Sequence, residues 1–203
     1  LAERRDGGWC EVRVDLEPGG RGTDGGTRFV ERLVPFADDT PDLLDRLAPG
    51  AAEGARVPVQ EPARDWLRDA LAVAGRDGLV VVFDYVSTTA EMAARPQEEW
   101  LRTYRGHRRG VSPLADLGTQ DITCEVAVDQ LALVREPDLH TTQAEWLRAH
   151  GVEGLVEDAR RTWRERAHIG DLAAVAARSR VTEADALLDP AGLGGFAVLE
   201  WRP

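Results

Sequence analysis

The sequence predicts an α/β fold, and two neighbouring segments support the prediction. Residues 61–74 place apolar side chains at helical spacing behind Pro62, and proline favours the first turn of a helix. Residues 79–83, Leu-Val-Val-Val-Phe, form a short β-branched run that is typical of a strand buried on both faces in a parallel sheet. A helix, a glycine turn at Gly75 and such a strand make an α/β unit.

The amino-terminal part is expected to form a hairpin. Residues 9–16 alternate strand-like and polar side chains, and residues 29–34 are a second strand-like run. Glycine-rich residues 18–26 join the two runs. This connection has no buried strand before it, no lysine and no helix after it, so we predict a flexible turn and not a phosphate-binding loop.

Residues 101–123 have no regular period and are predicted to form an ordered loop. A proline and a glycine fix turns in the segment. The segment lacks the bias toward serine, lysine and glutamate that is typical of disordered chains, and five apolar residues are expected to anchor it. These are Leu101, Val111, Leu114, Leu117 and Ile122. Residues 122–129 then alternate, which predicts a strand with Ile122, Cys124, Val126 and Val128 on its buried face.

Helices and one strand are expected after residue 140. Thr142 and Glu145 form a capping-box pattern, and Gly151 is placed to end the helix that follows. Residues 155–163 and 172–177 give two more apolar stripes, Thr182 with Asp185 opens a short fourth helix, and residues 196–201 form a final strand. Three tryptophans at helical positions are predicted core anchors, namely Trp66, Trp146 and Trp163.

Composition excludes several classes of function. The 203 residues suit one domain, with 43% hydrophobic and 30% charged residues, as in globular proteins. All 25 basic residues are arginine, against 36 acidic residues, for a net charge of −11. This balance argues against nucleic-acid or anionic-membrane partners, because phosphate neutralisation needs a basic surface. It is compatible with a cationic partner, although acidic surfaces also serve solubility alone.

The sequence contains no motif that is typical of a metal site or of a hydrolase. Cys10 and Cys124 lie far apart without metal-ligand spacing, so neither a zinc site nor a disulfide framework is expected. His140, His150 and His168 are expected at surfaces or helix ends. No nucleophile elbow or zinc-binding histidine pair occurs. No apolar run approaches the length of a membrane span, so we expect a cytoplasmic enzyme.

Two groups of residues are candidates for a functional site. Asp84 and Tyr85 follow the buried strand, and ligands of open α/β sheets bind beyond the carboxyl ends of strands. The structural alternative is that Asp84 caps the next turn while Tyr85 packs beneath the loop. Tyr104, His107 and Asp121 fall in residues 101–123. There the alternatives are a surface histidine and an Arg105 that pairs with Asp116 or Asp121 to hold the loop closed.

The chain resembles the MidA family of S-adenosylmethionine-dependent methyltransferases. Family members have an apolar strand ending in Asp-Tyr, then a Tyr-Arg-x-His segment and a Pro-Leu-x-Asp-x-Gly-x-x-Asp-(Leu/Ile)-Thr run. The corresponding segments here are residues 81–85, 104–107 and 113–123, with further matches at 142–147, 150–152 and 194–199. The likeness covers most of the chain after about residue 55, and its central segment is long and specific.

The resemblance implies a Rossmann-like class I methyltransferase fold with an inserted hairpin and extra carboxyl-terminal helices. It implies S-adenosylmethionine as cofactor and a protein arginine as acceptor, with Asp84, Tyr85, Tyr104, His107 and Asp121 around the acceptor. The family's glycine-rich cofactor turn and the acidic residue that ends its second strand are not in this sequence. We therefore expect residues 1–203 to be the carboxyl-terminal portion of one catalytic domain, and we assign no cofactor-binding residue. A non-catalytic assembly module or another Rossmann-type enzyme are the alternatives.

Overall fold

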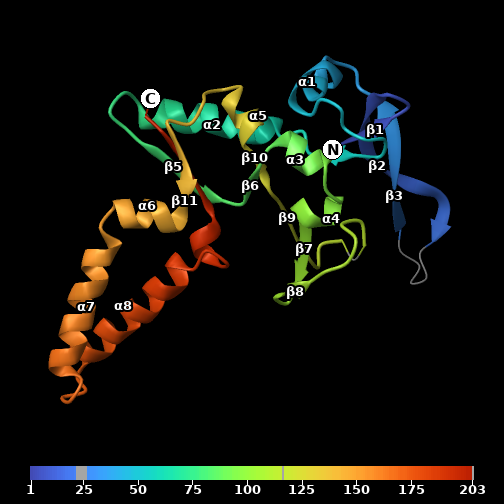
Figure 1. The fold of residues 1–203 in the computed structure, drawn as a ribbon. Helices are drawn as coiled ribbons and strands as arrows, with labels where there is room; N and C mark the ends of the chain where they lie inside the picture. The colour runs from blue at the N-terminus through green and yellow to red at the C-terminus, as the bar shows by residue number, and fades with distance from the viewer. Residues whose placement is uncertain (22–26, 116, 203) are drawn as a thin grey trace. The chain divides into compact units, whose positions relative to one another are not determined.

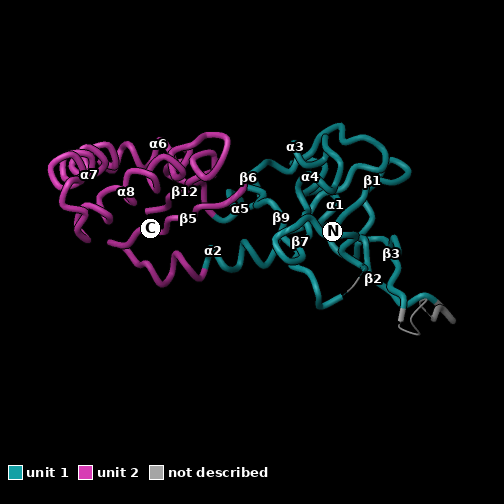
Figure 2. The backbone as a smooth tube through the Cα atoms, turned by 90° about the horizontal axis from the view of Figure 1, so that it is seen from below, with its two compact units in different colours: residues 1–68, 86–134 teal, residues 69–85, 135–203 magenta. Residues whose placement is uncertain are grey.

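The computed structural model of the protein describes residues 1–21, 27–115 and 117–202 (Figure 1). The chain forms two compact units, which Figure 2 shows in different colours. Unit 1 holds residues 1–68 and 86–134, and unit 2 holds residues 69–85 and 135–203. Residues 22–26, the last five residues of the connection predicted to be a flexible turn, lie outside the described residues.

An antiparallel sheet with strand order β3-β2-β1-β4 begins unit 1. Its strands are β1 (Ala2–Arg5), β2 (Gly8–Arg21), β3 (Thr27–Pro35) and β4 (Arg56–Val57). β2 and β3 form the predicted hairpin, with Val14 opposite Glu31 and Leu16 opposite Phe29. β3 is an edge strand, because β2 is its one strand partner among the described residues.

A second small sheet, with strand order β8-β7-β9, lies in the segment predicted to be an irregular loop. Its strands are β7 (Leu101–Arg105), β8 (Arg108–Arg109) and β9 (Asp121–Cys124). The loop prediction is therefore wrong for both ends of residues 101–123, where the strands are too short for a period of two to be recognised. Val111, Leu117 and Ile122 are exposed, so three of the five predicted anchors are also wrong.

Short helices and a parallel strand pair complete unit 1. They are α1 (Thr40–Leu47), α3 (Thr89–Ala93), α4 (Gln97–Trp100), α5 (Val128–Ala132), β6 (Val86–Ser87) and β10 (Val126–Ala127). The core of the unit gathers Trp9 from β2, Leu44 from α1, Met92 from α3 and Trp100 from α4. Burying aromatic side chains of this size supplies much of the hydrophobic free energy of a small unit.

The predicted buried face of residues 122–129 is reversed in the structure. Glu125 and Ala127 are buried, whereas Ile122 is exposed and Val126 is half-buried. Alternation places these side chains on opposite faces, but it does not say which face is inside. Ala127 fits the core because it is small, and the Glu125 carboxylate is buried together with the groups that donate hydrogen bonds to it.

The sheet of unit 2 has strand order β11-β12-β5. Its strands are β11 (Leu139–Thr142), β12 (Ala197–Trp201) and β5 (Val80–Asp84). Both outer strands run antiparallel to β12, so β5 and β11 are parallel to each other. α2 (Glu61–Ala74) precedes β5 as predicted, and Gly75 ends it with a φ of +64°.

The strand β5 forms as predicted, but the prediction that it is buried on both faces in a parallel sheet is wrong. Among the described residues β5 pairs with β12 alone, in antiparallel register, and Phe83 is exposed. A continuous apolar run indicates a strand but not the direction of its neighbour. Phe83 still has an apolar contact, since its ring meets Trp146 edge-on with centroids 5.2 Å apart.

The helices of unit 2 are α6 (Gln143–Ala149), α7 (Val152–Arg166) and α8 (Leu172–Leu188), followed by a 3₁₀ turn (Leu193–Gly195). The Thr142–Glu145 capping box is present as predicted. The separate helix predicted at Thr182 is wrong, because α8 continues through it. The Thr182 hydroxyl donates to the Arg178 carbonyl one turn back, so it caps no new helix.

The tryptophan predictions are only partly confirmed. Trp66 is more than half exposed, because its neighbour Leu67 is the buried residue of α2. Trp146 and Trp163 are half-buried. The Trp146 indole donates to the carboxylate of Glu200, a buried residue of β12.

Candidate functional site

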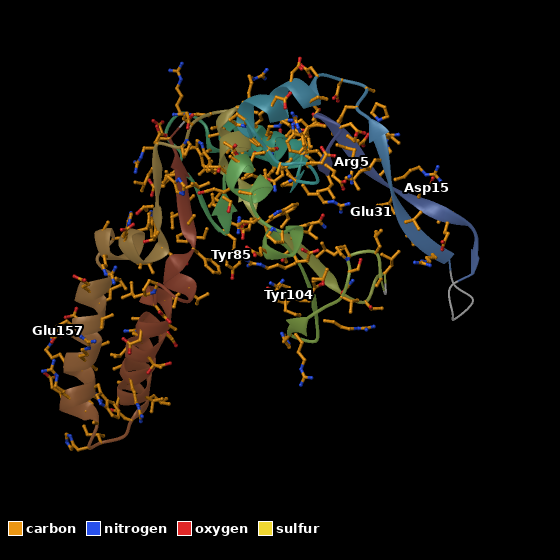
Figure 3. All side chains as sticks on the ribbon, turned by 45° about the vertical axis from the view of Figure 1, so that its right-hand side comes forward. Arg5, Asp15, Glu31, Tyr85, Tyr104 and Glu157 are labelled. Atoms are coloured by element: carbon orange, nitrogen blue, oxygen red, sulfur yellow. The ribbon has the colours of Figure 1, made fainter. Side chains whose placement is uncertain are left out.

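Asp84 and Tyr85 lie at the carboxyl end of β5 in unit 2. The Tyr85 amide donates to Asp84 Oδ1 at 2.7 Å, a contact between consecutive residues. The Tyr85 ring packs on Phe196, with centroids 4.3 Å apart, while 48% of the residue stays exposed (Figure 3). An aromatic surface is therefore fixed on one side and open to solvent on the other.

Tyr104 and Asp121 lie directly opposite each other in unit 1, across the β7–β9 pair. Tyr104 also lies opposite Arg109 of β8, and the Arg109 guanidinium is 5.8 Å from the centre of the Tyr104 ring. Cross-strand partners in an antiparallel sheet share a face. One face of this sheet therefore presents a carboxylate, a phenol and a guanidinium together.

His107 lies at the exposed tip of the β7–β8 hairpin. Arg105 pairs with Arg108, which leaves Gly106 and His107 as the two-residue loop. Both have positive φ, +52° and +63°, as the central residues of type I′ hairpin turns do. Histidine tolerates this conformation better than β-branched residues do, so the turn and an accessible imidazole are compatible.

The five predicted residues are divided between the two units. Tyr104, His107 and Asp121 belong to unit 1, and Asp84 and Tyr85 belong to unit 2. Of the predicted loop-closing contacts, the one to Asp116 lies outside the described residues. The Arg105 guanidinium donates to Thr119 Oγ1 at 3.0 Å, so it does contact the return segment of the loop.

A cleft of about 1010 Å³ lies within unit 1, beside strand β3, and we call it the β3 cleft. Strand β3, helix α4, strand β7 and the segment after β8 all contribute to its walls. Its lining residues are 28–31, Arg56, Gln97, Glu98, Leu101, Thr103 and 109–115. Thr103 lines the cleft, whereas its neighbour Tyr104 does not.

Gln120 holds the segment 110–115 that forms one wall of the β3 cleft. Its side-chain oxygen accepts from the Val111 amide, and its amide group donates to the carbonyls of Ser112 and Ala115 at 2.9 Å each. Thr103 Oγ1 donates to the Val111 carbonyl at 2.6 Å. The wall is thus fixed by side chains and is not a freely mobile loop.

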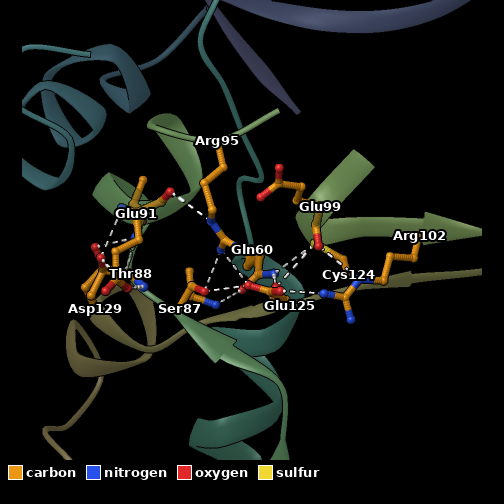
Figure 4. A network of polar contacts seen from close by, with 12 residues as sticks. Gln60, Ser87, Thr88, Glu91, Arg95, Glu99, Arg102, Cys124, Glu125 and Asp129 are labelled. Atoms are coloured by element: carbon orange, nitrogen blue, oxygen red, sulfur yellow. Dashed lines mark hydrogen bonds and ion pairs between the residues drawn. The ribbon is translucent and has the colours of Figure 1, made fainter. Parts of the chain in front are cut away.

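Glu125 is the centre of a buried polar network in unit 1 (Figure 4). The residue is 6% exposed. One carboxylate oxygen accepts from Arg95 at 2.8 Å and from the Ser87 hydroxyl, and the other accepts from Arg102 at 3.1 Å. Burial raises the pKa of Glu125, but hydrogen bonds from Arg95 and Ser87 and the two positive charges outweigh burial and lower it.

Gln60 and Gln130 extend this network beneath β9 and β10. Gln60 donates to the Glu125 carbonyl and accepts from the Ala127 amide, both at 2.7 Å. Gln130 donates to the Pro58 carbonyl at 2.8 Å, and Asp129 accepts from the amide and hydroxyl of Thr89. The network fixes the end of β9, and so the strand that presents Asp121.

Sequence reasoning missed Gln120 and Glu125. Gln120 has no motif, because its role is to bond backbone groups that only the folded turn brings near. Glu125 had a usable signal, since it is a charged residue within the strand-like run 122–129 with two arginines upstream. Buried carboxylates require such partners.

The described residues contain no group of three or more histidine, cysteine, aspartate or glutamate side chains that would hold a metal ion. Within the same residues, no helix is both long and apolar enough to cross a membrane.

Residues 1–144 match the family model described as "Putative S-adenosyl-L-methionine-dependent methyltransferase". The chain belongs to this family. The match covers most of the chain and includes the segments around Asp84, His107 and Asp121. S-adenosylmethionine is accordingly the cofactor of the family. A comparison with curated proteins gives no match.

Two solved structures from Burkholderia thailandensis have the same fold. One is an uncharacterized protein, 23% identical, with a TM-score of 0.74 over 98% of this chain and 50% of its own. The other, bound to S-adenosyl-homocysteine, is 24% identical, with a TM-score of 0.72 over 98% of this chain and 48% of its own. The chain thus spans about half the length of these neighbours, and at such identities the likeness establishes the fold alone.

The contacts of the described residues do not identify which of them would hold S-adenosylmethionine. The end of β5 is the expected position for a ligand, but there one Asp84 oxygen is bonded to the Tyr85 amide. Neither Asp84 nor Tyr85 lines the β3 cleft. We therefore assign no cofactor-binding residue and derive no chemical step through the cofactor.

Proposed function

We propose that the chain is part of an S-adenosylmethionine-dependent methyltransferase of the MidA type that modifies a protein arginine. The observation that supports this most is the family match over residues 1–144, because it includes all five candidate residues. These are Asp84, Tyr85, Tyr104, His107 and Asp121. The neighbour bound to S-adenosyl-homocysteine adds support for the cofactor.

The proposal extends to domain organisation and location. The chain would supply the carboxyl-terminal portion of the catalytic domain, as its resemblance to the MidA family implies, and it spans about half the length of each structural neighbour. The parts of such an enzyme that correspond to the rest of the neighbours would hold most of the cofactor. A cytoplasmic location belongs to the same proposal, and cell fractionation with an antibody to the chain tests it.

Arginine methylation suits the carboxylates of the candidate residues. A guanidinium is protonated at neutral pH and is a poor nucleophile until its proton is held by another group. Asp121 is exposed and adjoins Tyr104, so the pair offers an acceptor and a phenol to an incoming guanidinium. The acceptor nitrogen loses a proton as it gains the methyl group, and His107 or a carboxylate would take that proton.

Calorimetry and methyl transfer test the proposal on the intact protein that contains this chain. S-adenosyl-homocysteine should give binding heat, and radiolabelled S-adenosylmethionine should label arginine in cell extract proteins. His107→Ala and Asp121→Asn should each lower transfer by about a hundredfold or more, the usual range for lost acid–base groups. The matched controls His168→Ala and Asp77→Asn change exposed residues outside the candidate set and should leave transfer unchanged.

The alternative of a non-catalytic assembly module predicts the opposite results. In that case saturating S-adenosyl-homocysteine would give no heat, and no protein would be labelled. If labelling occurs but neither His107→Ala nor Asp121→Asn changes it, the enzyme remains and these two residues have structural roles.

A further inference from the structure

The register between β7 and β9 decides whether Asp121 and Tyr104 share a face. The two residues lie directly opposite each other in the antiparallel pair. Because side chains alternate along a strand, a slip of one residue would place Asp121 on the face opposite to that of Tyr104. Three of the four residues of β9 are exposed, so burial of one face does not specify the register there.

Glu125 directly follows β9 and ties its end to β7. Its backbone amide donates to the carbonyl of Trp100 at 2.9 Å, and its carboxylate accepts from the Arg102 guanidinium at 3.1 Å. Trp100 is fully buried, and Arg102 lies two residues before Tyr104 in β7. Main-chain and side-chain bonds from one residue therefore fix where the pairing of β9 with β7 ends.

The Glu125 carboxylate is held from several sides (Figure 4). Arg95 and the Ser87 hydroxyl bond one oxygen, and Arg102 bonds the other. Arg102 is itself held, because its Nε donates to the Glu99 carbonyl at 2.9 Å. Charge-assisted hydrogen bonds of this kind have a defined geometry, so a shifted β9 would break them. The network therefore favours the observed register.

We propose that Glu125 is a positioning residue for methyl transfer, which through Arg102 sets the register of β9 against β7 that keeps Asp121 beside Tyr104. Glu125 is buried and both of its oxygens accept hydrogen bonds, so it acts through Asp121 and not on the acceptor. This inference deepens the proposed methyltransferase function and rests on it for the role of Asp121.

Fluorine NMR on the intact protein that contains this chain, labelled with fluorotyrosine, tests the positioning without any methyl transfer. The resonance that Tyr104→Phe removes belongs to Tyr104, and Asp121→Asn should shift it because the two side chains are cross-strand neighbours. Glu125→Gln should shift or broaden the same resonance. The matched control is Glu200→Gln, which neutralises a similarly buried carboxylate of unit 2 and should leave the Tyr104 resonance unchanged.

A double-mutant cycle tests whether Glu125 acts through Asp121. In the intact protein, Glu125→Gln should lower kcat about tenfold or more, because a small displacement of a reacting group costs that much. In the Asp121→Asn background it should lower the residual kcat by less than about twofold, since the carboxylate that it positions is gone. A loss of folded protein alone would lower kcat by the same factor in both backgrounds.

Two matched arginine variants locate the path from Glu125 to β7. Arg102→Gln and Arg95→Gln each remove one guanidinium from Glu125, and the two arginines are similarly exposed. Arg102 lies in β7 and Arg95 does not, so Arg102→Gln alone should shift the Tyr104 resonance and lower kcat. This pair also serves if Glu125→Gln does not fold, and circular dichroism checks the folding of each variant.

Three results would overturn the positioning role: an unchanged Tyr104 resonance in Glu125→Gln, an equal loss of kcat in both backgrounds, or equal effects of Arg102→Gln and Arg95→Gln. Failure of the methyltransferase function gives a different pattern. Cofactor heat and arginine labelling would then be absent from the wild-type protein, while Glu125→Gln would still shift the Tyr104 resonance.

Discussion

Replacing Glu125 with glutamine should destabilise unit 1 more than any exposed charge replacement. Glutamine keeps the size of the side chain but removes the charge that holds Arg95 and Arg102 in place. Both guanidiniums would remain beside a neutral group in a partly buried site, and the Ser87 hydroxyl would lose a charged acceptor.

The expected loss follows from the exposure of the partners. Breaking a fully buried ion pair costs about 3–5 kcal/mol. The Arg95 and Arg102 side chains are 30% and 25% exposed, so water can hydrate them in part. We therefore expect Glu125→Gln to lower the free energy of unfolding by about 2–3 kcal/mol, which moves a urea midpoint by about 1 M.

Urea unfolding followed by circular dichroism and tryptophan fluorescence measures this loss. The control is Glu136→Gln, an exposed glutamate. Because the pKa of Glu125 is lowered in the folded protein, its stabilising contribution is present above the unfolded pKa, about 4.3, and is lost as pH falls through the folded pKa. The difference in the free energy of unfolding between Glu125→Gln and wild type should have its complete value at pH 7 and should become smaller below about pH 4. A change under 0.5 kcal/mol at pH 7, or one independent of pH, would refute the reasoning.

Two further substitutions test local features. Gly110→Ala should cost about 1–3 kcal/mol in the same unfolding assay, because its Cβ would displace Thr103 and Gln120, whereas Gly154→Ala in α7, where a Cβ meets nothing within 4 Å, should be neutral or stabilising. Equal effects would contradict the packing argument. Thr142→Ala should cost about 1 kcal/mol through the lost capping box of α6, while Thr162→Ala in the interior of α7 should not; equal costs would show that the cap adds nothing.

The elements that sequence reasoning placed correctly have local causes. The capping box at Thr142 and the glycine at Gly75 act within one turn of chain, and the hairpin of β2 and β3 follows from alternation along each strand. The errors concern non-local partners. Alternation around Glu125 does not show which face meets the core, and the apolar run of β5 does not show that its neighbour β12 runs antiparallel.

The candidate site, like the fold, could be predicted only in part from the sequence. The motif segments led to Tyr104 and Asp121, which the structure places opposite each other, although the prediction treated them as loop residues. Gln120 was not recognisable, since its function is to bond three backbone groups of a turn whose path no short pattern specifies.

Binding of S-adenosyl-homocysteine to the intact protein that contains this chain, measured by calorimetry, tests the central claim most directly. A methyltransferase should give saturable heat with one cofactor per catalytic domain, and addition of radiolabelled S-adenosylmethionine should then label protein arginine. Absence of heat at saturating ligand, with no labelled protein, would contradict the claim.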